Sequence, residues 1–179
     1  MLPAARQGSL IGVARNASTF VRNAVESDAQ PICDIYNGYV LGTTITFEQH
    51  AVAVPDMAAR IKDVSAKYPW LVADSDKGIL AYAYATRWRS RAAYDRTVES
   101  TIYVRSDATG SGIGFPLYLA LLEELRGRSV HAVVGCIALP NPGSVAFHER
   151  CGFKKVALFP EVGRKLDRWV DVGFWQVLL

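Results

Sequence analysis

Residues 98–115 read Val-Glu-Ser-Thr-Ile-Tyr-Val-Arg-Ser-Asp-Ala-Thr-Gly-Ser-Gly-Ile-Gly-Phe. This stretch predicts a strand, a glycine loop and the first turn of a helix, in that order. Glycines 110, 112 and 114 let the backbone approach an anion without an intervening Cβ. The first N–H groups of the helix have no intrahelical partner, and the helix dipole adds partial positive charge there. The stretch therefore predicts a site for a ligand that carries a pyrophosphate.

Two common phosphate-binding motifs do not fit this loop. The dinucleotide fingerprint needs Gly-x-Gly-x-x-Gly and an acidic residue about 20 residues further on. The glycine spacing here is different, and the next expected strand, residues 130–137, contains no acid. The nucleoside-triphosphate loop needs a lysine beside its last glycine, but no lysine occurs between Lys77 and Lys154.

The loop resembles that of the GNAT acyltransferases, which read Arg/Gln-x-x-Gly-x-Gly/Ala at the end of a strand. Other blocks, in the same order and spacing over about residues 20–179, make the chain similar to the phosphinothricin N-acetyltransferases within that superfamily. These blocks are Tyr68-Pro-Trp-Leu-Val-Ala73, Ala81-Tyr-Ala-Tyr-Ala85, Arg91-Ala-Ala-Tyr94, Glu99-Ser-Thr-Ile-Tyr-Val104, Leu139-Pro-Asn141, Ser144-Val145, His148-Glu149 and Trp169-Val-Asp-Val-Gly-Phe-Trp-Gln176.

Size and composition indicate one globular domain. The chain has 179 residues, half of them hydrophobic and 21% charged, with a net charge of +3 from 20 basic and 17 acidic residues. That charge is too small to indicate a nucleic acid or an anionic membrane as partner. No apolar run approaches the roughly 18 residues of a membrane span.

Cysteine and histidine usage argues against disulfides and metal. Cys33, Cys136 and Cys151 are odd in number and widely spaced. We expect reduced, mostly buried thiols in a cytoplasmic protein. The three histidines do not form a metal-ligand cluster, so no metal site is expected.

Residues 1–18 are expected to lie outside the fold. This leader holds Arg6 and Arg15, no acid, and several Ala and Gly. An organellar transit peptide has this composition, and so does sequence upstream of the true start or a cloning leader. The single domain is therefore placed at residues 19–179, and removal of the leader is expected to change neither stability nor turnover.

Hydrophobic periodicity predicts seven strands and four helices. The strands are expected at 19–23, 70–74, 79–86, 98–104, 130–139, 154–162 and 168–178. The helices are expected to begin near Ser27 or Asp28 as N-cap, at Pro55, just after the glycine loop, and after Asn141. The resulting α/β order, with a mixed and mostly antiparallel sheet flanked by helices, is that of the GNAT acyl-CoA N-acyltransferase fold.

The resemblance implies acetyl-CoA as co-substrate and assigns residues to it. Backbone of Ile102, Tyr103 and Val104 is expected to grip the pantetheine and acetyl carbonyl, and Asn141 to contact the pantetheine arm. The pyrophosphate is expected on residues 109–115: Thr109, Gly110, Ser111, Gly112, Ile113, Gly114 and Phe115. Thr109 and Ser111 depart from the family, which usually has Arg or Gln at the first position and Lys, Arg or Thr at the second. We therefore expect weaker binding of the coenzyme.

Glu99 and His148 are the expected catalytic residues. A carboxylate inside an apolar strand is seldom buried without a partner or a role, and Glu99 occupies the family position of a general base. A partner for an arginine is the alternative. His148 matches a family histidine with a catalytic part, against the alternative of a helix-surface histidine.

The acceptor pocket is expected to include two arginines, a tyrosine and an apolar wall. Arg87, Arg89 and Arg91 alternate near a strand end, and like charges on one side repel unless an anion neutralises them. The resemblance places Arg89, Arg91 and Tyr94 in the pocket, and Arg87 outside it. Phe47 is the expected wall, and Glu99, Ser100 and Thr101 complete the site.

The function implied is transfer of acetyl from acetyl-CoA to the α-amine of a small amino acid, by direct transfer in a ternary complex. Phosphinothricin and methionine sulfoximine or sulfone are the expected acceptors, which would make the enzyme a detoxification or resistance factor, and a homodimer is the expected assembly. Alternatives are a non-catalytic acyl-CoA-binding module, or a GNAT enzyme for another amine such as a polyamine or a protein N-terminus.

Overall fold

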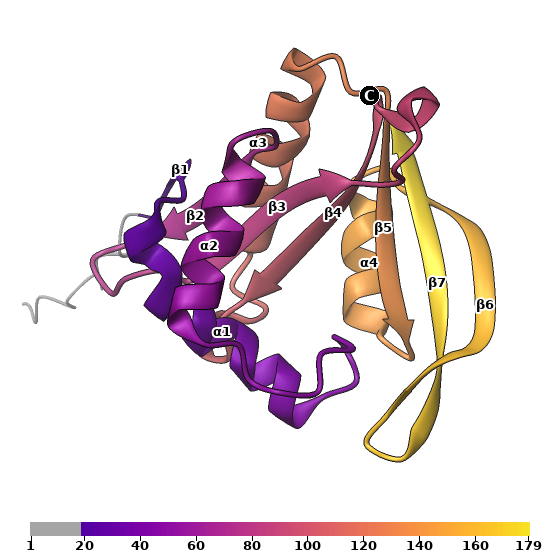
Figure 1. Cartoon of the computed structure of the whole chain (residues 1–179), viewed down its shortest axis with the longest axis horizontal. Coiled ribbons are helices and arrows are strands. Elements are labelled where there is room, and N and C mark those ends of the chain that lie inside the picture. The colour runs from indigo at the N-terminus through magenta and orange to yellow at the C-terminus, as the bar shows by residue number, and fades with distance from the viewer. Residues whose placement is uncertain (1–18) are drawn as a thin grey trace, which may run out of the picture.

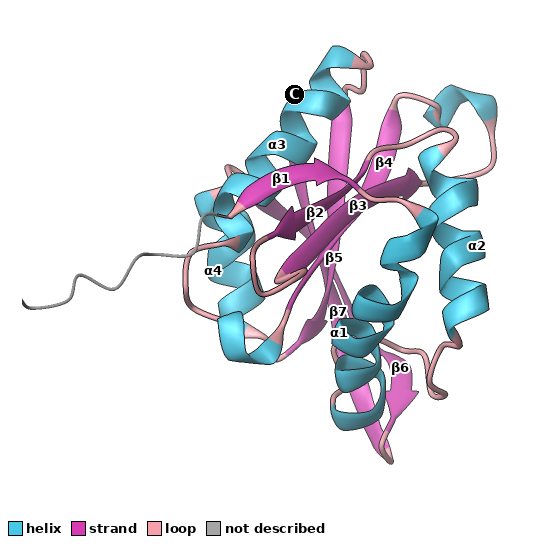
Figure 2. Cartoon of the chain, turned by 90° about the vertical axis from the view of Figure 1, so that its left-hand side faces the viewer, coloured by secondary structure: helices cyan, strands magenta, loops and turns pink. Residues whose placement is uncertain are grey.

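The computed structural model describes residues 19–179, which form one seven-stranded sheet with helices on both faces (Figures 1 and 2). The strands are β1 (Phe20–Asn23), β2 (Trp70–Asp74), β3 (Ala81–Arg87), β4 (Thr97–Val104), β5 (Ala132–Leu139), β6 (Lys154–Lys165) and β7 (Arg168–Leu178). The helices are α1 (Ala29–Gly42), α2 (Val54–Ser65), α3 (Gly114–Gly127) and α4 (Pro142–Arg150), with short 3-10 turns at Glu26–Asp28, Ala92–Tyr94 and Ser106–Ala108. The expectation for the leader, residues 1–18, falls outside the described residues.

The sheet order is β1-β2-β3-β4-β5-β7-β6, and β4–β5 is the parallel pair in an otherwise antiparallel sheet. A parallel pair needs a long crossover, and α3 supplies it. The expected mixed, mostly antiparallel sheet and the order of its elements are confirmed. Helices α1 and α2 cover one face and α3 and α4 the other (Figure 2).

Helix α3 packs against the alanine side of β3. Leu117, Leu121 and Leu125 recur every four residues and are fully buried. They meet Ala81, Ala83 and Ala85, which are also fully buried. Small side chains on the strand let the leucine side chains of α3 approach the sheet closely.

The opposite face has its own core beneath α1 and α2. Ile32, Ile35 and Tyr36 of α1 and Met57 and Ile61 of α2 are buried there, as helical spacing predicts. Aromatic rings of the sheet complete this layer: Trp70 stacks on Tyr84 with ring centroids 4.2 Å apart, and Tyr103 meets Tyr36 at 5.1 Å.

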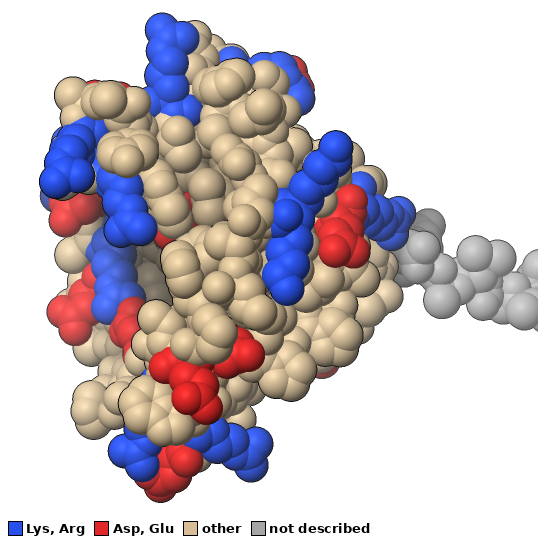
Figure 3. Space-filling model, turned by 90° about the vertical axis from the view of Figure 1, so that its right-hand side faces the viewer, with Lys and Arg blue, Asp and Glu red and all other residues tan. Residues whose placement is uncertain are grey.

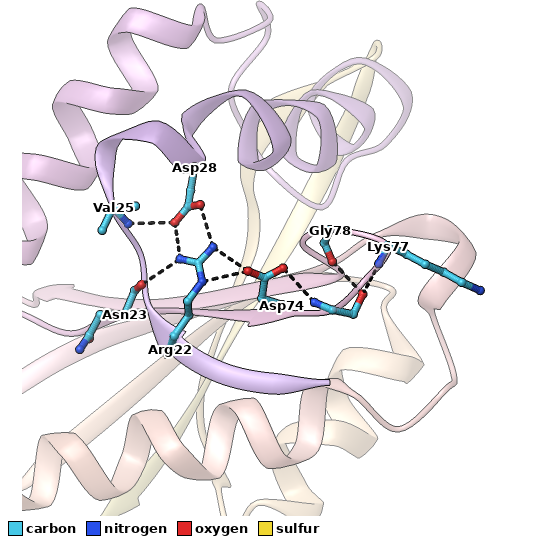
Figure 4. Close-up of polar contacts among 8 residues, drawn as sticks. Arg22, Asn23, Val25, Asp28, Asp74, Lys77 and Gly78 are labelled. Carbon is cyan, nitrogen blue, oxygen red and sulfur yellow. Dashed lines mark hydrogen bonds and ion pairs between the residues drawn. The ribbon is translucent and has the colours of Figure 1, made fainter. Parts of the chain in front are cut away.

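The expected N-cap position of α1 is confirmed at Asp28, but its side chain does not cap the helix. Asp28 stands before α1, but its carboxylate makes no cap hydrogen bond to that helix. It accepts instead from the guanidinium of Arg22 at 2.7 and 2.9 Å and from the backbone N–H of Val25 at 2.9 Å. Arg22 also donates to Asp74 at 2.9 Å, so one arginine joins β1, β2 and the entry to α1 (Figure 4). A charged partner is a stronger competitor for the carboxylate than a backbone N–H.

Replacement of Asp28 by Asn should lower the free energy of unfolding at pH 7 by roughly 1.5–3 kcal/mol, the usual value for hydrogen bonds to a charged group. The Arg22 hydrogen bond lowers the pKa of this buried carboxyl against the opposing effect of burial. A depressed pKa contributes stability above the unfolded-state pKa of about 3.9, and that contribution is lost as the pH falls through the folded-state value. Urea unfolding should therefore show a difference between the proteins that shrinks below about pH 4.

Asp34→Asn is the matched control. Asp34 is an exposed carboxylate of α1 that accepts a hydrogen bond from Gln30. Its loss should change stability by no more than about 0.5 kcal/mol. Equal losses in both variants would show that the ion triad does not hold β1 in place.

Candidate acyl-transfer site

Strands β4 and β5 separate in the middle of the sheet. Their pairing runs from Thr97↔Ala132 to Ser100↔Gly135 and stops there, although β4 continues to Val104 and β5 to Leu139. Figure 1 shows the two strands diverging. Each remains paired on its outer side, with β3 and β7. The edges that face the wedge between them therefore offer backbone groups to an extended ligand with amide bonds, such as pantetheine.

The glycine loop lies at the end of β4. The N–H groups of Gly110, Gly112, Ile113 and Gly114 have no protein acceptor within residues 19–179. Gly110 and Gly112 have φ values of +78° and +86° and open space where a Cβ would stand. Together with the N-terminus of α3 they form a cradle that fits a pyrophosphate.

Thr109 and Ser111 use their hydroxyls to hold the loop. Thr109 donates to the carbonyl of Arg105 at 3.3 Å, and Ser111 donates to that of Ala108 at 2.5 Å. Neither side chain carries a charge, so the loop itself supplies only backbone donors and neutral hydroxyls to an anion.

Gly114 brings α3 directly onto β4. A Cβ there would lie 3.4 Å from Ile102 and 3.5 Å from Val104. The side chains of Ile102 and Val104 thus face α3, while Tyr103 faces α1, where Tyr39 donates to the Val104 carbonyl at 2.6 Å. This segment could bind a coenzyme through its backbone, in the manner the resemblance implies.

Asn141 stands at the open end of β5. Its side-chain oxygen accepts from the backbone N–H of Ser144 at 3.1 Å, which caps α4. The capping role is an ordinary one for asparagine before a proline-initiated helix.

Glu99 is half-buried on β4, one residue before the last residue that pairs with β5. Its neighbours across the strands are Thr86 and Val134. Loss of hydration raises the pKa of this carboxyl above its ordinary value, and the nearby Arg89 partly opposes that rise. A carboxylate with a raised pKa in a partly dehydrated site has the properties of a general base.

His148 lies on the other side of the sheet from Glu99, and it is buried rather than on the helix surface. Its ring packs against Tyr118, Phe147 and Phe153, and a Cβ on Gly135 would come within 2.9 Å of its Nε2. The glycine therefore leaves room for the ring at the point where β4 and β5 separate.

The protonation of His148 follows from its contacts. Nδ1 lies 2.8 Å from the Ser144 carbonyl, which can only accept, so Nδ1 carries the proton. Burial lowers the pKa of the ring, against the opposing effect of that hydrogen bond. The neutral ring thus turns the lone pair of Nε2 toward Gly135.

Ser100 faces α3, because successive residues of a strand point to opposite faces. Its hydroxyl shares a 2.7 Å hydrogen bond with that of Tyr118, and both side chains are buried. The structure therefore places Glu99 and Thr101 on one face and the Ser100 side chain on the other. Only the backbone of Ser100 can reach a ligand on the Glu99 face.

The arginines near the end of β3 differ in their partners. Arg87 forms an ion pair with Asp95 at 2.7 Å. Arg89 and Arg91 are exposed and have no ion pair within residues 19–179. Tyr94 follows in the same loop and is 40% exposed. Two guanidinium groups in the same loop, both without an ion pair among the described residues, favour an anionic ligand.

Several residues of this region escaped the sequence analysis. Trp88 stacks under the Arg89 guanidinium at 4.7 Å and meets Phe174 of β7 at 5.8 Å, and Phe174 in turn meets Phe159 at 5.1 Å. Trp88 lies between the alternating arginines, but its contact with Phe174 joins segments 86 residues apart. No local signal predicts such a contact.

The expectation of mostly buried thiols was wrong for Cys136, which is exposed, while Cys33 is buried and Cys151 is intermediate. Cys136 follows Gly135 on β5, just beyond the last pair with β4, so β4 does not pair with it. Its cross-strand neighbour is Phe174. Local dehydration and the charge of Glu99 raise the pKa of this thiol to about 12, so it is protonated at neutral pH.

Phe47 is held by the β6–β7 hairpin. Its ring lies against Gly163, where a Cβ would come within 2.3 Å of it. Lys165 is 4% exposed and donates from Nζ to the carbonyl of Thr46 at 2.7 Å. This buried ammonium, whose pKa burial lowers despite the nearby Glu48, fixes the loop that carries Phe47.

Within residues 19–179, no group of three or more His, Cys, Asp or Glu side chains is arranged to hold a metal ion. In the same part of the chain, no helix has the length and apolar character needed to cross a membrane.

A strand wedge, a loop of free N–H groups and a half-buried carboxyl are the parts of an acyl-CoA transferase, and comparison with known proteins agrees. The Acetyltransferase (GNAT) domain family matches residues 21–173, and the chain belongs to this family. It is thus an acetyltransferase with acetyl-CoA as co-substrate.

Individual relatives are similar over nearly the whole domain. The phosphinothricin N-acetyltransferase of Streptomyces viridochromogenes is 36% identical, covering 87% of this chain and 85% of the relative. The L-methionine sulfoximine/L-methionine sulfone acetyltransferase of Pseudomonas paraeruginosa is 36% identical, covering 90% and 95%. The crystal structure of a phosphinothricin acetyltransferase from Sinorhizobium meliloti in complex with AcCoA superposes with a TM-score of 0.86 at 33% identity, covering 90% and 88%.

Proposed function

We propose that this acetyltransferase acylates the α-amine of a small amino acid whose side chain ends in an anionic or tetrahedral group, with phosphinothricin and methionine sulfoximine or sulfone as leading acceptors. The observation that carries the proposal is that Arg89 and Arg91 lack ion-pair partners among the described residues, and that Arg89 lies close enough to the half-buried Glu99 to affect its pKa. The names of the relatives support the same acceptor class. Detoxification of such compounds is the role that follows.

The proposed reaction is direct transfer in a ternary complex. Glu99 takes a proton from the ammonium of the acceptor, directly or through a water, and the amine nitrogen attacks the thioester carbonyl. A C–N bond forms and the C–S bond breaks, and the nitrogen gives its second proton to the departing sulfur, so that the coenzyme leaves as the thiol. Backbone of residues 102–104 and the cradle 109–115 hold the donor, Asn141 contacts its pantetheine arm, and Phe47, Arg89, Arg91, Tyr94, Thr101 and the Ser100 backbone hold the acceptor.

An acyl-enzyme on cysteine does not fit this site. Burial raises the pKa of Cys151 to about 11, and the pKa of Cys136 is about 12. The thiolate is the nucleophilic form, so both groups are poor nucleophiles at neutral pH. Free thiols among the described residues also fit a reducing compartment, and we propose that the enzyme works in the cytoplasm.

Glu99→Gln keeps the shape of the side chain and removes its basicity. Turnover should fall by about 100- to 10,000-fold, with the dissociation constant of acetyl-CoA nearly unchanged. The measurement is thiol release under saturating donor. Near-normal turnover in Glu99→Gln together with inactivity of His148→Ala would assign the base to His148, whose Nε2 lone pair is the other proton acceptor at this point of the sheet.

Substitutions of Arg89 and Arg87 form a matched pair that tests whether Glu99 is the base. Arg89→Met removes the charge that holds the Glu99 pKa down, so the acid limb of the pH–rate profile should move to higher pH. Arg87→Met removes a charge that Asp95 already neutralises and should leave the limb in place. If the two variants shift the limb equally, the limb does not report Glu99.

Arg91→Ala should raise the Michaelis constant of phosphinothricin by about one to two decades, because a charge-assisted contact is worth roughly 1.5–3 kcal/mol. The constant for acetyl-CoA should stay the same, since the glycine loop is a separate site. Arg91→Lys should restore the loss only in part, because an ammonium cannot form the paired fork. If Arg91→Ala raises the Michaelis constant of an analogue with a neutral side chain as much as that of phosphinothricin, this acceptor class is excluded. If the wild-type protein binds acetyl-CoA but acetylates no acceptor, it is a binding module rather than an enzyme.

We also propose a homodimer through the β6–β7 hairpin. Seven apolar residues of this hairpin are 43–61% exposed: Val156, Leu158, Phe159, Val162, Leu166, Trp169 and Leu178. The outer edge of β6 has no strand partner in the sheet. Figure 3 shows a broad uncharged area on this side of the molecule, with charged groups scattered around it. Phe159 contacts Phe174, and Phe174 contacts Trp88, which precedes Arg89. A second copy bound to this face would therefore lie next to the proposed acceptor site.

Trp169→Glu should convert a dimer of about twice 19.6 kDa into a monomer in sedimentation equilibrium. A buried charge without a partner opposes association strongly. Leu119→Glu, an exposed leucine of α3 on another side of the fold, is the control and should leave the dimer intact. A monomeric wild-type protein at micromolar concentration would exclude the proposed interface.

A further inference from the structure

Arg150 is the last residue of α4, and its guanidinium lies beside the glycine loop. The Cζ atom stands 4.2 Å from the ring centroid of Phe115. Phe115 is the second residue of α3 and directly follows the free N–H groups of Ile113 and Gly114. A cation from a different helix is thus placed next to the backbone cradle.

No carboxylate among residues 19–179 neutralises this cation. Arg150 has no ion pair with any residue from 19 to 179, and the adjacent Glu149 accepts instead from the indole N–H of Trp175 at 3.3 Å. The other arginine next to the loop, Arg105, is already paired with Asp107 at 2.6 Å. The charge of Arg150 is therefore available to an anion from outside the chain.

Stacking on Phe115 also orients the guanidinium. The ring covers one face of the planar group and leaves its N–H bonds free at the edge. Those N–H groups match the oxygens of a phosphate in pairs. Thr109 and Ser111, by contrast, offer only hydroxyls, and both donate to loop carbonyls.

We propose that Arg150 binds a phosphate group of acetyl-CoA and supplies, from α4, the cation that residues 109 and 111 of the loop lack. This assignment rests on the coenzyme lying along the wedge and the glycine loop, as proposed above. Binding of the coenzyme is accordingly stronger than the uncharged loop residues alone predict.

Removal of the charge with its stem retained is the sharpest test. Arg150→Met keeps the apolar contact with Phe115, and Arg150→Lys keeps the charge without the paired fork. The dissociation constants of acetyl-CoA, acetyl-dephospho-CoA and acetyl-pantetheine should be measured for each protein. We expect Arg150→Met to weaken acetyl-CoA by about tenfold, Arg150→Lys to weaken it less, and neither to change acetyl-pantetheine, which has no phosphate.

The three donors also say which phosphate is bound. A tenfold loss that persists with acetyl-dephospho-CoA places Arg150 on the diphosphate, and a loss that disappears places it on the 3′-phosphate; either result supports the proposal. Equal losses for all three donors, or no loss for acetyl-CoA, would overturn it. If the Arg150 proposal is overturned but the wild-type protein binds acetyl-CoA in the same assay, the proposed function is unaffected.

Arg126→Met is the matched control. Arg126 lies near the opposite end of α3, about 18 Å away along a helix that rises 1.5 Å per residue. The substitution removes the same charge from the molecule but none from the loop. A loss of acetyl-CoA binding as large as that of Arg150→Met would mean that total charge, and not a local contact, sets the affinity.

Discussion

The parting of β4 from β5 is the constraint on which the rest of the site depends. Backbone groups of a sheet are normally satisfied by the next strand, and an unsatisfied one is costly when buried. Here the pairing ends at Ser100↔Gly135 while both strands continue, and each is kept extended by its outer neighbour. Packing against α3 on one side and α1 on the other holds the wedge open, so a ligand meets preformed backbone donors and acceptors rather than a surface that must first be ordered.

The same point of separation explains the environment of the ionisable groups around it. Glu99 lies at the last paired residues and loses part of its hydration, so its pKa rises. Cys136 lies just beyond, exposed to the wedge. The His148 ring packs against Gly135, which has no side chain to exclude it, on the face of the sheet that α4 covers. Burial lowers the pKa of the ring and keeps it neutral. Three groups with different protonation thus lie close to the point where the pairing of β4 with β5 stops.

Arginines in this chain fall into two groups by their partners. Arg22, Arg87 and Arg105 are neutralised by aspartates and hold local structure together. Five arginines have no ion pair among residues 19–179: Arg89, Arg91, Arg96, Arg150 and Arg168. We propose that Arg89 and Arg91 serve the acceptor and Arg150 the coenzyme. Unpaired guanidinium groups repel one another and gain most from an external anion. Because Arg96 and Arg168 also lack a partner in this part of the chain, an unpaired guanidinium does not by itself mark a substrate site. Arg89 is distinguished by its effect on the Glu99 pKa, and Arg150 by its contact with Phe115 next to the glycine loop.

The sequence by itself determined the class of fold, the order of its elements, the glycine cradle and the strand that carries Glu99, because these depend on periodicity and on backbone freedom within a few residues. It also identified His148 and the arginine segment, through resemblance. Only the tertiary structure decided that His148 is buried opposite Glu99, that Asp28 serves Arg22 rather than the helix, that Cys136 is exposed, and that Arg150 lies on Phe115. Each of these is a contact or a gap between segments distant in sequence, and its energy is set by which neighbours the packed chain brings together, which no local pattern encodes.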